Sequence, residues 1–147
     1  MPVKSFECTC EGALTEYAGS KIDIEQKTSG LVVVKFTQLV LVQKLQDDYI
    51  EELSGRALMT PAVAGQILAK GDDSGIISEE KTTIYWSATA TLMYIMQYSR
   101  PEIYNATRGQ SRHMKELREA HAKALQTLIK YVVFTKNRGL VLAPTAL

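Results

Sequence analysis

The sequence of 147 residues predicts an α+β fold, in which an N-terminal β-hairpin precedes a mostly helical bundle of about four helices. Two features of the sequence point to this class. Apolar and β-branched residues flank a Gly-containing turn near residue 30, which is typical of a hairpin. After residue 37, apolar residues recur every three or four positions, which is the period of an amphipathic helix.

Residues 1–36 form the first predicted region and are expected to be rich in strands. Residues 3–10 are strand-compatible, and residues 14–26 alternate between apolar and polar side chains. The sequence Thr28-Ser29-Gly30 is a turn signal, after which the apolar residues 31–36 are expected to pair back.

Residues 37–56 form a second region with a single helix over residues 38–53, for which Thr37 is the expected N-cap. Residues 57–80 are rich in Gly, Pro, Ser and Asp, so they are expected to be an exposed linker. Residues 81–147 are then the main helical region.

Three helices are expected between residue 79 and residue 134. The one over residues 79–98 is apolar on most sides, which predicts that it is buried. A short helix over residues 101–113 begins with Pro101 and is interrupted by Gly109. A long helix over residues 112–134 has a clear apolar face, and residues 140–142 are expected to begin a further strand.

The overall charge of +1 conceals two unequal halves. Residues 1–96 carry a net charge of −5 and residues 97–147 carry +6. A basic half can bind phosphates, or it can pair with the acidic half. No apolar run is long enough for a membrane span and no secretory signal is evident, so we expect an intracellular protein, in the cytoplasm or the nucleus, with no membrane partner.

Catalytic and metal sites find little support in the residue pattern. The paired acids Asp47-Asp48 and Asp72-Asp73 lack the strand-hairpin context that a two-metal site requires, so a helix face and a turn are the favoured interpretations. A metal site built from Cys8, Cys10, His113 and His121 matches no standard zinc spacing. We therefore expect no catalytic residue, no metal and no cofactor, with His121 as a core or interface histidine.

A basic stripe on the predicted helix 112–134 is the positive signal. Four cations are placed on or close to the side opposite the apolar face, along about 27 Å of helix: Arg112, Lys115, Lys123 and Lys130. Such a stripe is able to follow a nucleic-acid backbone by phosphate contacts without reading bases. The alternative is an ordinary solvated helix face.

An ordered set of residues resembles the Ty1/copia class of retrotransposon reverse transcriptases. The early segments are Phe6-Glu7-Cys8, residues 14–22, Phe36-Thr37-Gln38, Tyr49-Ile50-Glu51 and Thr60-Pro61. The later ones are Tyr85, Ser87, Leu92, Tyr94, Arg100-Pro101, Ile103, Ala106, Ser111-Arg112, Met114, His121, Ala124, Tyr131, Thr135 and Gly139-Leu140. The chain departs from the family at Trp86, where the family has arginine, and at Ala90, where it has glycine.

The resemblance implies the end of the palm in residues 1–36, a thumb-like helix in 37–56 and a connection-like helical region in 81–147. It also implies a place after the polymerase catalytic acids and before ribonuclease H, so activity of the chain alone is not expected. Its role would be to grip an RNA–DNA or DNA duplex and to link polymerase to ribonuclease H, with Arg100 as an additional contact or structural residue. The alternative is a domesticated interaction module that meets other proteins through an exposed strand edge or the apolar helix.

Overall fold

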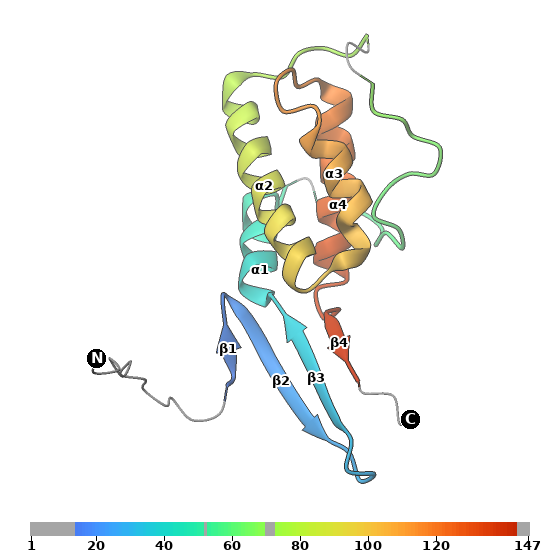
Figure 1. Cartoon of the computed structure of the whole chain (residues 1–147). Coiled ribbons are helices and arrows are strands. Elements are labelled where there is room, and N and C mark those ends of the chain that lie inside the picture. Colours follow the sequence, from blue (N-terminus) through green and yellow to red (C-terminus); the bar gives the residue numbers. More distant parts are fainter. Residues whose placement is uncertain (1–13, 52, 70–72, 144–147) are drawn as a thin grey trace, which may run out of the picture.

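The computed structural model describes residues 14–51, 53–69 and 73–143 and confirms an α+β fold. A four-stranded antiparallel sheet projects from one end of a bundle of helices (Figure 1). The elements run in the order β1 (Glu16–Tyr17), β2 (Ser20–Gln26), β3 (Val32–Thr37), α1 (Leu39–Asp48), α2 (Glu79–Tyr98), the 3-10 turn η1 (Pro101–Ile103), α3 (Tyr104–Ser111), α4 (Glu119–Phe134) and β4 (Leu140–Leu142).

The sheet has the order β1-β2-β3-β4, so the C-terminal strand closes the edge of the N-terminal hairpin. β2 pairs with β3 from Lys21↔Thr37 to Gln26↔Val32, and β4 pairs with β3 from Phe36↔Leu140 to Val34↔Leu142. The sequence predicted a strand at residues 140–142, but it did not predict that this strand would pair with β3. Gly139 allows the approach, because a Cβ there would overlap the carbonyl oxygen of Phe36.

The strand expected over residues 14–26 is two strands, because the chain reverses at Ala18 and Gly19. Both residues have positive φ, 49° and 72°, as the two central residues of a type I′ hairpin turn do. The turn brings Tyr17 opposite Ser20. The strand predicted over residues 3–10 lies outside the described residues.

Helix α1 is shorter than predicted at both ends. β3 extends through Thr37, so the N-cap is Gln38, and the helix ends at Asp48 instead of residue 53. Asp47 and Asp48 occupy its last turn, where no basic residue is present. Negative charge at that end opposes the helix dipole, which favours termination there.

Helix α2 has the predicted bounds but is buried on one face only. The residues Tyr85, Ala88, Thr89, Leu92 and Ile95 face the core, together with Val42 and Leu45 of α1 and Leu125, Leu128, Ile129 and Val132 of α4. The side chains of Ile84, Trp86 and Met93 are exposed. The prediction that α2 is buried on most sides was wrong, because α2 lies at the side of the bundle (Figure 1).

Helix α4 begins at Glu119, seven residues after the predicted start at Arg112. Arg118 is extended, with φ −122° and ψ 166°, and bridges to Ile76. The Nδ1 atom of His121 accepts a hydrogen bond from the backbone N–H of Arg118 at 3.0 Å, which caps the helix start. Leu117 inserts its side chain into the core, so residues 112–118 are a turn and not helix.

The segment expected to be a linker, residues 57–80, has no strand or helix before α2 in its described part, apart from the bridge at Ile76. It is nevertheless attached to α4. The carbonyl oxygen of Ala69 contacts Nε2 of His121 at 3.2 Å, and that of Ser74 accepts from Nη1 of Arg118 at 2.9 Å. These contacts hold the segment against the start of α4.

Candidate nucleic-acid interface

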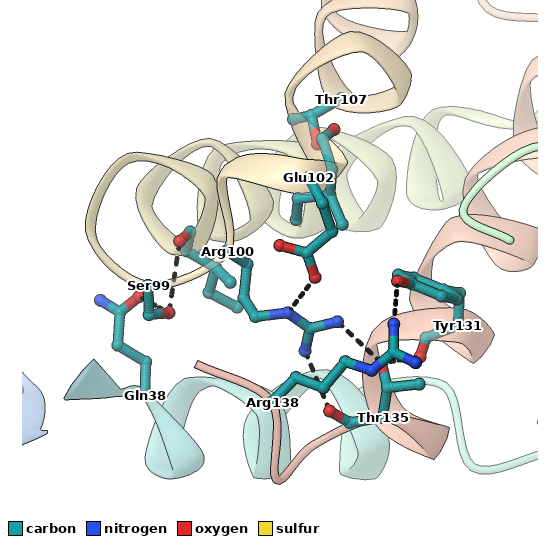
Figure 2. A network of polar contacts seen from close by, with 10 residues as sticks. Gln38, Ser99, Arg100, Glu102, Thr107, Tyr131, Thr135 and Arg138 are labelled. Atoms are coloured by element: carbon teal, nitrogen blue, oxygen red, sulfur yellow. Dashed lines mark hydrogen bonds and ion pairs between the residues drawn. The ribbon is translucent and has the colours of Figure 1, made fainter. Parts of the chain in front are cut away.

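Arg100 is a buried structural residue and does not form part of a surface. Its side chain lies between η1 and the end of α4 (Figure 2), and the residue as a whole is 1% exposed. Nε contacts a carboxylate oxygen of Glu102 at 2.5 Å, Nη1 donates to the carbonyl oxygen of Thr135 at 3.1 Å, and Nη2 donates to Oγ1 of Thr135 at 2.7 Å. Of the two roles considered for Arg100, the structure supports the structural one.

The contacts around Arg100 tie four elements together. Its guanidinium lies 5.6 Å from the centre of the Tyr131 ring, and Arg138 lies 5.9 Å from the same ring and donates to its hydroxyl. Beside it, the hydroxyl of Ser99 donates to Oε1 of Gln38 at 2.8 Å, which joins the end of α2 to the start of α1 (Figure 2). The cluster fixes the end of the bundle that meets the sheet.

Lys123 and Lys130 both lie on α4, but their side chains have different surroundings and do not form one row of free cations. Nζ of Lys130 donates to the carbonyl oxygen of Ser54 at 2.5 Å, so it is occupied by the segment after α1. Lys123 lines a cavity of about 170 Å³ between α1, α2 and α4, together with Lys81 and the acid Glu119. The predicted stripe along one helix is therefore wrong, because α4 begins after Arg112 and Lys115.

Arg112 and Lys115 instead belong to the outer side of α3 and the turn that follows it. Arg112 caps α3 with helical φ and ψ, so it lies one turn beyond Arg108, and both side chains are exposed. Lys115 follows three residues later in the turn and is also exposed. We call Arg108, Arg112 and Lys115 the α3 basic row. The sequence signal for Arg108 was its spacing of four from Arg112, which was missed because Arg112 was assigned to the following helix.

The inner side of α3 is fixed by polar contacts to α2. Thr107 and Gln110 are buried, and the hydroxyl of Tyr85 donates to Oε1 of Gln110 at 2.7 Å. Burial, followed by the influence of Tyr49, raises the pKa of Tyr85, so its hydroxyl stays protonated at neutral pH. This contact orients α3 so that Arg108 and Arg112 point away from the core.

The turn that carries Lys115 is held from both sides. Nε1 of Trp86 on α2 donates to the carbonyl oxygen of Met114 at 3.0 Å, and Leu117 is anchored in the core. The indole of Trp86 therefore helps to fix the turn. The His113 ring stacks on His121 with centroids 4.4 Å apart, which adds a further contact beneath the turn.

The acids close in sequence to the α3 basic row do not neutralise it. Ion pairs in the described ranges are Lys21–Asp23, Arg100–Glu102 and Arg118–Glu116, and none includes a member of the row. Glu116 is adjacent to Lys115 but contacts Nη2 of Arg118 at 2.7 Å. The row therefore presents three cations to solvent, which is an arrangement that suits an anionic partner.

The acids considered as catalytic pairs lie at the end of a helix and in an irregular segment. Asp47 on α1 accepts a hydrogen bond from Gln43 at 2.9 Å, and Asp48 is exposed at the helix end. Asp73 is exposed in the irregular segment, whereas Asp72, Cys8 and Cys10 lie outside the described residues. Within the described ranges, no cluster of three or more His, Cys, Asp or Glu side chains is arranged to hold a metal ion.

None of the helices that the structure describes is both long enough and apolar enough to cross a lipid bilayer. Comparison with known proteins gives no relative: no protein-family model, no curated protein and no solved structure matches the chain.

Proposed function

We propose that this chain is a non-catalytic, phosphate-contacting segment of a copia-type reverse transcriptase, or a remnant of one. It holds a template–primer duplex by its backbone, in the region between the polymerase and ribonuclease H parts of such an enzyme. Two things support the proposal: the ordered resemblance of residues 85–140 to that family, and the α3 basic row.

The α3 basic row is the observation on which the binding role rests. Arg108 and Arg112 are four residues apart on the exposed side of one helix, a spacing that sets their Cβ atoms about 6 Å apart. Successive phosphates of one nucleic-acid strand are separated by a similar distance, and Lys115 supplies a third exposed cation in the turn that follows. Arginine side chains can bind phosphate oxygens in a bidentate manner, and such contacts hold the backbone without reading the base sequence.

The number of cations sets the expected strength of binding. Three phosphate contacts release about three counterions, so log K should fall with log[salt] with a slope of roughly −2 to −3. Binding by this row alone is therefore weak and independent of sequence. In a complete polymerase, other contacts to the duplex would add to it.

The experiment is fluorescence anisotropy with a labelled RNA–DNA duplex at low salt. The test variant carries Arg108→Glu, Arg112→Glu and Lys115→Glu. The matched control carries Lys27→Glu, Lys44→Glu and Lys136→Glu, which reverses three exposed lysines on other elements and gives the same net charge. The proposal predicts loss of binding in the test variant and at most a small loss in the control.

Equal loss of binding in the two variants would show that only net charge matters and would overturn the assignment of the row. A folded wild-type chain that does not bind at low salt would overturn the nucleic-acid role as a whole.

A protein-interaction module is the second candidate, because α2 leaves large apolar side chains in solvent. Ile84, Trp86 and Met93 are 43%, 47% and 41% exposed, and they lie on a helix that also contributes to the core. The two candidates differ in the effect of Met93→Asp. This change would leave duplex binding intact under the first proposal and would abolish protein capture under the second.

A further inference from the structure

The sheet of this chain has one apolar face and one charged face. Because paired residues of neighbouring strands point to the same side, the register assigns every side chain to a face. One face is mainly apolar and carries Tyr17, Ile22, Ile24, Val32, Val34, Phe36, Leu140 and Leu142, with the uncharged polar residues Ser20 and Gln26 at its two ends. The other carries Glu16, Lys21, Asp23, Glu25 and Lys35, with Val33 and Val141 between them.

Most of the apolar face is not covered by other parts of the described chain. Ile22, at the end of the sheet next to the bundle, is buried, whereas Ile24 is 58%, Val32 is 41% and Leu142 is 50% exposed. Figure 1 shows the β2–β3 hairpin pointing away from the helical bundle. A contiguous apolar patch that spans three strands is unusual on a monomer and indicates an interface.

We infer that this apolar sheet face is the interface of a symmetric homodimer, in which the sheets of two copies pack face to face. The face has no charged side chain, so two copies bring no like charges together, and β-branched and aliphatic residues can interdigitate across a two-fold axis. The charged face, with its Lys21–Asp23 ion pair at 2.8 Å, stays in water.

The size of the face agrees with a weak dimer. Five or six residues along the strands cover about 18 Å and three to four strands cover about 15 Å, so the footprint is roughly 270 Å² on each copy. Two such footprints give a flat contact of about 540 Å², and the accessible area of the side chains is larger than this, so the contact belongs with weak or transient interfaces, which bury less than about 1,200 Å². We therefore expect a dissociation constant in the micromolar range or weaker, on the order of 10–100 μM.

The test is sedimentation equilibrium of the whole chain over a concentration series up to about 0.5 mM, well above that range. The wild-type mass should rise from 16.3 kDa towards twice that value. Ile24→Lys places a charge in the centre of the apolar face and should keep the chain monomeric. Glu25→Lys is the control. Glu25 is the next residue on the same strand, but its side chain lies on the charged face, so this variant should dimerise as the wild type does.

Circular dichroism establishes that both variants are folded, which is expected because both side chains are exposed in the single chain. A wild-type chain that is monomeric at every concentration would overturn the inference. A dimer that persists in Ile24→Lys would overturn the choice of face. None of these results depends on duplex binding, since the α3 basic row takes no part in the contact.

Discussion

Replacing Arg100 tests whether the buried clamp holds the bundle together. Arg100 makes three hydrogen bonds, two to Thr135 at 3.1 and 2.7 Å and one to Glu102 at 2.5 Å, and it is 1% exposed. Arg100→Lys keeps the charge but has one nitrogen in place of three, so it cannot reach both Thr135 and Glu102. Each lost bond to a charged group costs about 1.5–3 kcal/mol, and partial compensation by the ammonium leaves an expected loss of about 2–3 kcal/mol.

Arg100→Ala should cost about 3–5 kcal/mol, because it also removes the packing of the guanidinium against the Tyr131 ring. Urea unfolding followed by circular dichroism measures both values. Arg138→Ala is the matched control, because Arg138 contacts the same ring from an exposed position and should cost less than about 1 kcal/mol. A loss below about 1 kcal/mol for Arg100→Ala would refute the reasoning.

Three further substitutions test the local arguments by urea unfolding. Ala18→Asn should stabilise the chain by about 0.5–1 kcal/mol, because asparagine tolerates the positive φ that precedes Gly19; no gain would contradict the turn. Gly139→Ala should cost about 1–3 kcal/mol, because its Cβ would collide with the Phe36 carbonyl; a neutral result would contradict the close approach. Burial raises the pKa of Tyr85, so the free energy of unfolding of the wild type should fall above pH 10, by up to about 1.4 kcal/mol per pH unit. The fall should be less steep in Tyr85→Phe. Equal pH dependence of the unfolding free energy in the two proteins would contradict that account.

The sequence predicted the elements well where a local signal marked both ends. The predicted bounds of α2 were correct, and the structure shows a local signal at each end: Ser78 and the acids after it begin the helix, and Pro101 follows its end. The start of α4 was not predicted, because Arg118 is extended only through contacts with Ile76 and Ser74, which are more than forty residues away. Periodicity alone cannot detect a break that tertiary contacts impose.

Several of the residues on which the proposed family resemblance rests are structural. Arg100, Ile103, His121, Tyr131 and Thr135 lie in the clamp, the core or the start of α4. Their types therefore indicate how the chain folds more than what it binds. The basic row became visible only when the structure placed Arg112 at the end of α3 and Lys115 in the turn before α4.

The salt dependence of duplex binding tests the central claim most directly. The measurement compares the slope of log K against log[salt] for the wild type and for a variant with Arg108→Gln, Arg112→Gln and Lys115→Gln. If the row contacts three phosphates, the wild-type slope is steeper by about 2 to 3 units, and the difference does not depend on the duplex sequence. Equal slopes would show that the row does not contact the backbone and would contradict the proposed function.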